Sequence, residues 1–318
     1  MSNKSDKFGR SYEFAWAMAL EKYLPNAKII QNSSYKANKQ AWQSINEPQK
    51  DIYEISVNSA IDTLLELEPL LLEGEELQLE LQKDTFGIEG DVRDLLIKDI
   101  TSKWEIGLSI KHNHEAVKHS RLSHKLDFAA EWFGIPCSIH YWNDVKPIFE
   151  ILHIYKDQKL RWSKIPHKNT EIYIPLLQAF MNEIRRINEQ SHSYIHKMIT
   201  YLIGIKDYYK IVSKDKNRLT LISTFNMHGS LNLPGKNKIS IISIPKLELP
   251  TRLVALEFKP KSQNTIEMYF DRGWQLSFRI HSASKFVEPS LKFDIQFIGM
   301  PTTILNFECK WHVKEKYV

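Results

Sequence analysis

Cysteine is scarce in this sequence, and long apolar segments are missing from it. The two cysteines, Cys137 and Cys309, are far apart in a chain of 318 residues. Their scarcity excludes a disulfide framework and a zinc site built on cysteine, and it is typical of a reducing cytoplasm. No apolar run approaches the roughly 20 residues of a membrane-spanning helix. The first residues lack the layout of a secretory signal, because their apolar part is short and contains Glu13. We therefore expect a cytoplasmic protein that does not act at a membrane.

Internal repeats, low-complexity tracts and linkers rich in proline, glycine or serine are also absent from the sequence. Composition therefore marks no sharp boundary between domains. Hydrophobic residues make up 42% of the chain and charged residues 25%, which is typical of a globular protein with a sizeable core. A length of 318 residues suffices for one large domain or two ordinary ones.

The positive charge is concentrated in the last third of the chain. The net charge is +5 overall. Residues 1–206 contain 26 Lys and Arg against 28 Asp and Glu, whereas residues 207–318 contain 17 against 10. A basic part beside a neutral-to-acidic part indicates a polyanionic partner, with nucleic acid first and an anionic membrane second.

Periodicity predicts a layered core followed by a β-rich part. In residues 1–206 we predict helices at 9–24, 51–74, 114–134 and about 174–206, and strands at 75–82, 92–97, 103–113, 136–142 and 149–155. Residues 27–48 and the basic segment 156–168 are expected to be loops. In residues 207–318 we predict strands at 218–223, 238–244, 252–258, 265–283, 291–298 and 304–313, with a hairpin turn at 271–274. This order is typical of an α+β fold, a mixed sheet flanked by helices with a β-rich C-terminal part.

Two predicted strands bring acids, a hydroxyl group and a lysine together. Alternation along residues 103–113 places Trp104, Ile106, Leu108 and Ile110 on one face, and Glu105, Gly107, Ser109 and Lys111 on the other. Asp94 precedes the apolar run at residues 95–97. If the two strands are neighbours, Asp94 comes close to Ser109 and Lys111, and Gly107 leaves space on the same face.

These groups are the ones that phosphodiester hydrolysis needs. Carboxylates bind Mg²⁺, which keeps several of its own waters. The ion lowers the pKa of a bound water and stabilises the charge that develops on phosphorus. A lysine beside it orients or deprotonates the attacking water. The alternative is a charged strand with a solvated polar face, which is common in globular proteins. The combination of Asp94, the polar strand face, the His-rich segment that follows and an acidic first helix favours the site.

The same residues carry a resemblance to a known family. Asp94 before an apolar run, followed by Ser109-Ile110-Lys111 on the next strand, resembles the PD-(D/E)xK nuclease superfamily, whose first helix often contributes a glutamate that Glu13 matches. From MSNKSDKFGRSYEFAW onward, the whole chain resembles one family of type II restriction endonucleases. The resemblance implies Mg²⁺-dependent cleavage of double-stranded DNA at the palindrome GGCC. It also implies a bacterial restriction-modification system, in which a cognate DNA methyltransferase protects the host's own sites.

One position departs from the superfamily pattern. Ser109 stands where Asp or Glu is usual, which leaves the second metal ligand open. We assign Asp94 as the principal metal ligand and Lys111 as the water-activating residue, and we expect Glu105 and Ser109 to supply or support the second ligand. The further candidates for a metal-binding carboxylate are Asp91, Glu89 and Glu13. For Glu13 the alternative is a carboxylate on the helix surface.

The segment KHNHEAVKHSR, residues 111–121, has two interpretations. His112, His114 and His119 suggest a metal site, but no cysteine or third well-spaced acid completes a zinc set. We prefer contact with phosphate, because the start of a helix offers free N–H groups and a favourable dipole. The candidates for that contact are Lys118, His119, Ser120 and Arg121. Asn113 and His114 are expected beside the scissile bond, with a solvated helix face as the alternative.

Recognition of bases is expected from the basic part, residues 207–318, whereas residues 1–206 hold the catalytic core. Arg and Lys pair with guanine O6 and N7 in the major groove. The candidates are Arg252, Lys259, Lys261, Arg272, Gln275, Arg279 and Lys285. On residues 274–282 one face carries Gln275, Ser277, Arg279 and His281, and we expect this face to meet DNA. Trp162, in the basic loop, is either a wedge residue or part of the core.

Two other functions remain open at this stage. One is a DNA-binding protein with a nuclease-like fold and no catalysis. The other is a nuclease for RNA or for particular nucleic-acid structures. A palindromic site favours a homodimer on DNA, because two-fold symmetry in the protein matches two-fold symmetry in the site.

Overall fold

The computed structural model describes residues 4–83, 90–118, 120–237 and 239–312. The chain forms two compact units. The first unit comprises residues 1–115, 204–247 and 302–318, and the second comprises residues 116–203 and 248–301. This division differs from the boundary near residue 207 that we inferred from charge, because the chain passes between the units four times. None of the described helices combines the length and the apolar content that crossing a bilayer requires.

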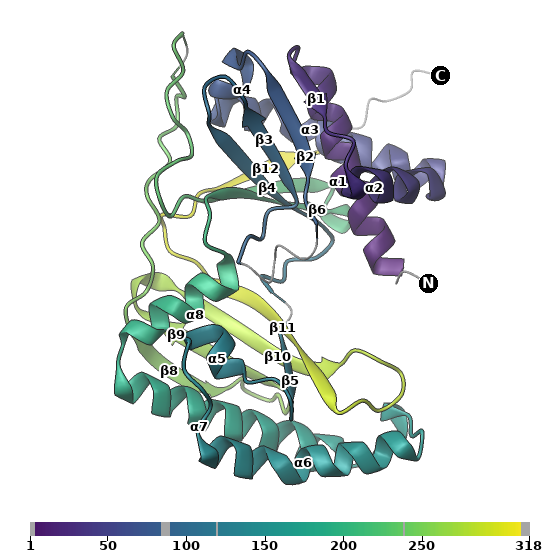
Figure 1. The fold of residues 1–318 in the computed structure, drawn as a ribbon, viewed down its shortest axis with the longest axis vertical. Coiled ribbons are helices and arrows are strands. Elements are labelled where there is room, and N and C mark those ends of the chain that lie inside the picture. The colour runs from purple at the N-terminus through teal and green to yellow at the C-terminus, as the bar shows by residue number, and fades with distance from the viewer. Residues whose placement is uncertain (1–3, 84–89, 119, 238, 313–318) are drawn as a thin grey trace. The chain divides into compact units, whose positions relative to one another are not determined.

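The first unit is built on a mixed seven-stranded sheet with the order β1-β2-β3-β4-β6-β7-β12 (Figure 1). Its strands are β1 (Ala27–Ile29), β2 (Leu77–Leu81), β3 (Leu95–Asp99), β4 (Glu105–His112), β6 (Tyr208–Lys214), β7 (Leu219–Phe225) and β12 (Asn306–Lys310). Neighbours β2, β3 and β4 are antiparallel, whereas β4 and β6 are parallel. The parallel pair joins two segments that lie about a hundred residues apart in sequence.

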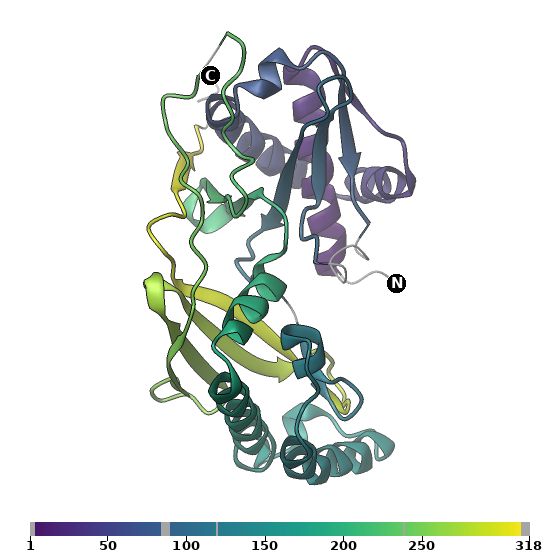
Figure 2. The same cartoon turned by 60° about the vertical axis from the view of Figure 1, so that its left-hand side comes forward.

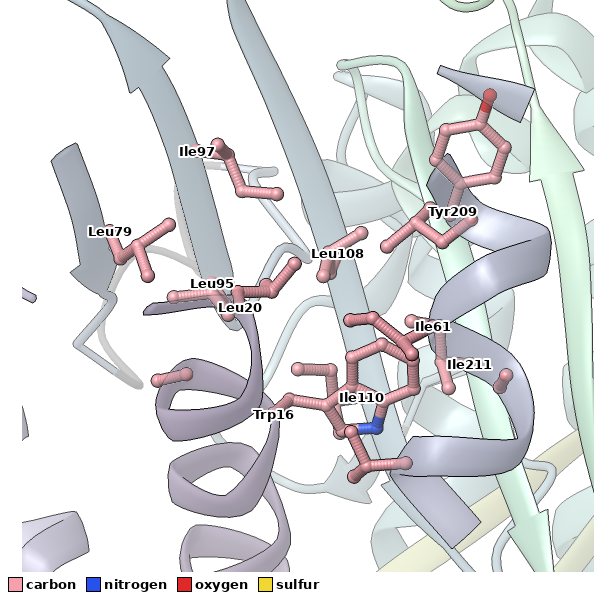
Figure 3. Packing of buried hydrophobic residues seen from close by; sticks show 14 of the residues in the cluster. Trp16, Leu20, Ile61, Leu79, Leu95, Ile97, Leu108, Ile110, Tyr209 and Ile211 are labelled. Carbon is pink, nitrogen blue, oxygen red and sulfur yellow. The ribbon is translucent and has the colours of Figure 1, made fainter. Parts of the chain in front are cut away.

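Helices cover the apolar face of this sheet. They are α1 (Lys4–Tyr23), α2 (Ser33–Ser44), α3 (Glu47–Leu67) and the short α4 (Leu70–Glu73). Figure 3 shows Trp16 and Leu20 of α1 and Ile61 of α3 packed against alternate residues of the strands. The strand side chains in this core include Leu79, Leu95, Ile97, Leu108, Ile110, Tyr209 and Ile211. Because side chains alternate along a strand, the residues between them face the other side of the sheet.

The second unit has an antiparallel sheet with the order β5-β11-β10-β9-β8. Its strands are β5 (Arg121–Ser123), β8 (Leu253–Phe258), β9 (Thr265–Phe270), β10 (Gln275–Ser282) and β11 (Ser290–Gly299). Its helices are α5 (Phe128–Phe133), α6 (Ile139–Asp157), α7 (Ile174–Gln190) and α8 (Ser193–Ile203). Short helical turns lie at Trp162–Lys164 and Asn169–Tyr173 in this unit, at Asp271–Gly273 between β9 and β10, and at Asp215–Asn217 between β6 and β7 of the first unit. Viewed from a second direction, α5, α7 and α8 lie along one side of the five-stranded sheet (Figure 2).

The expected α+β class is confirmed, and most strands of the two sheets were predicted near their observed places. The strands predicted at residues 75–82, 92–97 and 103–113 are β2, β3 and β4. The hairpin predicted at 265–283 is β9 and β10, with Asp271–Gly273 as its turn. The helix predicted at 174–206 is two helices, α7 and α8, because the backbone becomes extended at Ser191.

The prediction was wrong between residues 114 and 155. The expected helix at 114–134 is instead a segment with the short strand β5 and the short helix α5. The two strands predicted at 136–142 and 149–155 lie in one helix, α6. Ser138 begins α6 by accepting a hydrogen bond from the Tyr141 amide, and buried Tyr141, Val145, Phe149 and Leu152 follow at helical spacing. The β-branched and aromatic content of the segment concealed this spacing.

Two further predictions in the loops were wrong. Residues 27–48 contain β1 and α2 rather than a loop alone. The strand predicted at 238–244 does not form over the described residues 239–244, where Ile239 and Ile241 are exposed. The sequence KISIISI alternates in the way a strand does, but alternation supplies a strand only where a neighbouring strand is available to pair with it.

Candidate active site

Asp94 lies directly before β3, at the end of the β3–β4 pair where the two strands begin to pair. Leu95 is opposite Leu108 in the register of the two strands, and the Asp94 amide donates to the Leu108 carbonyl at 2.8 Å. This bond extends the pairing by one residue and places Asp94 beside Ser109. Since Leu95, Leu108 and Ile110 point into the apolar core (Figure 3), Asp94 and Ser109 lie on the opposite, polar face of the sheet.

Three groups of β4 converge on the Asp94 carboxylate. The Ile110 amide donates to Oδ2 at 2.6 Å, and the Ser109 hydroxyl donates to the same oxygen at 3.4 Å. Lys111 donates from Nζ to Oδ2 at 2.8 Å and to Oδ1 at 3.2 Å. The side chains of Asp94 and Lys111 are 21% and 32% exposed, so the ion pair is held in place but remains open to a ligand. The structure therefore brings Asp94, Ser109 and Lys111 together, as the strand pattern predicts.

Arg93 binds the other two carboxylates of this region, Asp91 and Glu105, although no pattern in the sequence singles it out. Its guanidinium donates to both oxygens of Asp91, from Nε at 2.8 Å and from Nη2 at 2.7 Å, and from Nη1 to Glu105 at 2.8 Å. The Arg93 side chain is only 5% exposed. It lies over Gly107, where a Cβ atom would be 2.0 Å from Cδ of Arg93. The space that Gly107 leaves on the polar face is therefore filled by Arg93.

This arrangement bears on the metal donors. Asp91 and Glu105 both pair with Arg93, whereas Asp94 pairs with Lys111. No group of three or more His, Cys, Asp or Glu side chains that could hold a metal ion occurs among the described residues. Mg²⁺ commonly takes one or two carboxylates and completes its shell with water and substrate oxygens. A single carboxylate at Asp94, beside the Ser109 hydroxyl, fits that requirement.

A second lysine lies on the same face, contributed by β6. Lys210 is opposite Ser109 in the parallel register of β4 and β6. It is buried and donates from Nζ to the Glu115 carbonyl at 2.8 Å. Burial, together with the nearby positive charge of Lys111, lowers the pKa of Lys210 to about 8. The sequence YYKIVSK does not alternate strictly, because β6 is buried on both faces, and nothing in it reveals that β6 pairs with β4.

Glu13 lies apart from this polar face. It belongs to α1, which packs on the apolar face of the sheet through Trp16 and Leu20 (Figure 3). Its carboxylate accepts a hydrogen bond from Asn38 of α2 at 2.8 Å. The structure thus places Glu13 between two helices rather than beside Asp94. Glu89, another candidate, is outside the described residues.

The His-rich segment does not begin a helix over its described residues, so the predicted helix start is wrong, whereas phosphate contact by this segment stays a prediction. His112 projects to the apolar face, where its ring lies 4.7 Å from that of Tyr53, and it binds the Ser213 hydroxyl at 2.8 Å. Burial lowers the pKa of His112, an effect that Asp215 opposes. Asn113 has a left-handed backbone with φ of 52° and exchanges hydrogen bonds with Asp215. His114 is half-buried in the segment that follows.

The phosphate-contact candidates Lys118, Ser120 and Arg121 belong to the second unit. The fourth candidate, His119, is outside the described residues. Lys118 lies over the Tyr201 ring at 3.5 Å, and burial lowers the pKa of Lys118 to about 8. Ser120 is buried. Arg121 is exposed on β5 and donates to the Ser290 hydroxyl at 3.3 Å.

The DNA-reading candidates occupy several surfaces of the second unit. Gln275 and Arg279 lie on β10, and Arg279 is exposed. Arg272 lies in the turn before β10, where its φ is 56°, and donates to the Leu249 carbonyl at 2.9 Å. Trp162 is 5% exposed and stacks on Tyr173, so it belongs to the core. Arg252, Lys259, Lys261 and Lys285 are exposed.

Comparison with known proteins identifies the family of this chain. The family model of the HaeIII restriction endonuclease matches residues 9–301. The type II restriction enzyme HaeIII of Haemophilus aegyptius is 46% identical over 316 residues, which cover 98% of this chain and 99% of that relative. No solved structure was found to match the chain. A match over nearly the whole length, at this identity, shows that the chain belongs to the HaeIII restriction endonuclease family.

Proposed function

We propose that this protein hydrolyses phosphodiester bonds of double-stranded DNA at a short palindrome, GGCC, with Mg²⁺ as its cofactor. The family supports the reaction, and the resemblance to one of its members supports the site. The observation that carries the chemistry is the Asp94–Lys111 pair, 2.8 Å apart and partly exposed on the polar face of the sheet. An acid and an amine that share one face beside two strand ends suit hydrolysis of a phosphate ester.

The core of the first unit supports a PD-(D/E)xK assignment. Asp94 precedes β3, the Ser109-Ile110-Lys111 triplet lies on β4, and a parallel strand, β6, adjoins β4. We infer that Ser109 replaces the second acid of the motif and that Arg93 withholds Asp91 and Glu105 from the metal. Asp94 is then the residue that would hold Mg²⁺. When bound, the ion supplies Lewis-acid stabilisation to the phosphate.

The protein's own residues have separate roles in this proposal. Asp94 fixes Lys111 through two hydrogen bonds, and the Ile110 amide fixes Asp94. The Lys111 ammonium orients the attacking water and offsets the negative charge of the phosphate. Lys210, opposite Ser109, adds a second positive charge on the same face. Asn113 and His114 follow β4 and are proposed to contact the DNA near the scissile bond.

The proposed endonuclease function also implies an oligomeric state, a partner enzyme and a cellular location. A palindromic site favours two copies of the chain related by a two-fold axis, and we propose a homodimer on DNA. A cognate methyltransferase would modify the same sequence and protect it. We place the enzyme in the bacterial cytoplasm, where a restriction-modification system acts.

The first test is a digest of unmethylated plasmid DNA with Mg²⁺ or with EDTA, beside plasmid methylated at the cytosines of GGCC. Discrete bands that need Mg²⁺ and vanish on methylated DNA are expected. A smear would remove the sequence specificity. Intact DNA under every condition, from a folded protein, would favour a DNA-binding protein without catalysis. Cleavage of RNA or single strands at no fixed site would favour the other nuclease class.

The second test replaces Lys111 by Ala. We expect the cleavage rate to fall roughly 10²- to 10³-fold, while affinity for the duplex changes much less. The matched control is Lys98→Ala, since Lys98 shares the polar face but pairs with Glu80 at 2.6 Å. Gel assays of cleavage and fluorescence anisotropy of binding separate the two effects. Cleavage by Lys111→Ala at the wild-type rate would contradict the assignment.

A further inference from the structure

The five-stranded sheet of the second unit has one face that none of the described helices of that unit covers. Its apolar face packs on helices: the Phe278 ring lies 6.1 Å from Trp132 of α5 and 6.3 Å from Phe180 of α7. Alternation places Ser277 and Arg279 of β10 on the other face. This polar face therefore has the side chains of a binding surface rather than of a core.

The polar face carries a hollow of about 550 Å³ that lies entirely within the second unit. We call it the Arg279 hollow. It is lined by Lys259, Pro260, Lys261, Ser262, Thr265, Ser277, Arg279, Asp294 and Gln296. Its floor comes from the central strands β9, β10 and β11, and one wall comes from the turn between β8 and β9.

Arg279 occupies the centre of this hollow in a fixed geometry. It is opposite Asp294 on β11 and Thr265 on β9 in the strand register. Its Nη2 donates to Oδ2 of Asp294 at 3.0 Å, and Gln296 donates to the same oxygen at 3.2 Å. The Arg279 side chain is 54% exposed, whereas that of Asp294 is 10% exposed. The buried carboxylate thus orients an accessible guanidinium.

The charges around the hollow differ between centre and rim. Lys261 is an exposed cation of the turn that lines the hollow, and Arg121 and Lys292, which are not among the lining residues, lie side by side on β5 and β11. These positions suit contact with phosphates. At the centre, the carboxylate of Asp294 lies against the guanidinium and would repel a phosphate, whereas a neutral acceptor meets no such repulsion.

We propose that Arg279 reads a guanine in the major groove and that Asp294 is its positioning residue. This inference rests on the proposed function, because it needs a DNA substrate with a defined site. Guanine presents two acceptors, O6 and N7, to the major groove, and a guanidinium fork donates to both. Arginine carries donors only, so the centre of the hollow matches that edge. Adenine presents one acceptor and one donor there and fits a guanidinium less well.

The test measures binding to duplexes in which each guanine of the site is replaced, one at a time, by 7-deazaguanine, which lacks N7. The full-length Lys111→Ala protein is used with Mg²⁺, so that DNA is bound and not cut. Arg279→Ala should weaken binding to the unmodified duplex roughly 5- to 150-fold. On the duplex whose modified guanine Arg279 contacts, the same substitution should cause a smaller loss, because only the bond to O6 remains to be removed.

Two other variants make the result specific. Asp294→Asn should weaken binding less than Arg279→Ala does, and its loss should also decrease on the same modified duplex, which a merely structural role would not produce. Arg279→Lys keeps the positive charge but removes the two-pronged guanidinium. This variant should lose most of the difference in affinity between the unmodified and the modified duplex. Arg185→Ala is the control, because Arg185 lies on α7 and donates to the Leu256 carbonyl at 2.8 Å. It should leave the ratio between the duplexes unchanged.

The outcomes distinguish a failure of this inference from a failure of the proposed endonuclease function. Equal losses for Arg279→Ala on all duplexes, or full affinity in Arg279→Lys, would overturn the inference and leave the nuclease intact. A thermal unfolding curve for each variant identifies any loss of DNA affinity that misfolding causes. If Arg279→Ala is misfolded, the comparison between duplexes uses Arg279→Lys instead. If the wild-type protein neither cleaves nor binds any duplex, the proposed function itself fails.

Discussion

At the scale of single residues, Gly107 and Arg93 occupy one place on the polar face of the first sheet. Alternation along β4 predicts that Gly107 lies on the same face as Ser109 and Lys111, and the structure agrees. What the sequence does not reveal is the occupant of the space that a glycine leaves. Arg93 fills it because its guanidinium is drawn between Asp91 and Glu105, which lie on different segments. Such an occupant depends on tertiary neighbours, so strand periodicity alone cannot identify it.

Replacing Gly107 by Ala should therefore destabilise the protein. A Cβ atom 2.0 Å from Cδ of Arg93 forces the guanidinium out of its place between two carboxylates. We expect the free energy of unfolding to fall by about 1–3 kcal/mol, measured by urea denaturation. Gly9→Ala in α1 is the control, since a Cβ there meets nothing within 4 Å, and it should raise stability by about 0.5–1 kcal/mol.

Measuring Gly107→Ala in a protein that also carries Arg93→Ala tests whether the clash with Arg93 causes the destabilisation. In Arg93→Ala, the atoms that the new methyl group meets are gone, so Gly107→Ala should cost much less there than in the wild-type protein. An equal cost in both backgrounds would mean that Arg93 is not what excludes a side chain at residue 107.

At the scale of elements, the sequence predicts those strands whose alternation is strict and whose neighbours are near in sequence. β2, β3 and β4 follow one another and were all predicted. β6 was not identified, although it supplies Lys210, because burial on both faces removes its alternation. Asp94, Ser109 and Lys111 could be brought together from β3 and β4 alone, whereas Lys210 needs the distant pairing of β4 with β6.

A buried carboxylate joins three elements of the first unit and predicts a pH dependence of its stability. Glu68 follows α3 and is fully buried. Its Oε1 accepts from the Tyr209 hydroxyl of β6 at 2.7 Å and from the Asn232 amide at 2.6 Å. Burial raises the pKa of Glu68 from 4.5 to about 7, against these two hydrogen bonds.

The sign follows from proton binding. Between pH 4.5 and about 7 the folded protein keeps the Glu68 proton and the unfolded chain has lost it, so stability falls as the pH rises through this window. The loss is about 3 kcal/mol for a shift of this size. Glu68→Gln should remove this dependence and be more stable than the wild-type protein at pH 8. Urea denaturation at pH 5 and pH 8 gives the change in the free energy of unfolding between these pH values for each protein. An equal change in the wild-type protein and in Glu68→Gln would contradict the raised pKa of Glu68.

At the scale of the whole molecule, the sequence does not reveal how the chain is divided between the two compact units. The charge count separates residues 1–206 from 207–318, but β6, β7 and β12 of the basic part complete the first sheet. Conversely, β5 and α5 to α8, from the earlier part, belong to the second unit. A chain that crosses between units leaves no composition change at the crossings, because both sides of each crossing belong to packed cores.

The excess of positive charge nevertheless predicts how the protein meets DNA. Seventeen Lys and Arg stand against ten Asp and Glu in residues 207–318, and Lys259 and Lys261 of this set line the Arg279 hollow. Each phosphate that a cation neutralises contributes roughly −0.9 to the slope of log K against log salt. Lys259→Gln/Lys261→Gln should therefore make this slope shallower by about 2, while cleavage at saturating DNA stays at a fixed site.

The matched control is Lys146→Gln/Lys197→Gln, two exposed lysines of α6 and α8 on the helical side of the same unit. This pair should leave the slope unchanged although it removes the same formal charge. Fluorescence anisotropy from about 50 to 200 mM salt gives both slopes. If the two double variants change the slope equally, the attraction arises from net charge alone. If only the first does, the polar face of the second sheet is where the phosphate backbone lies, and the guanine contact of Arg279 falls between those phosphates.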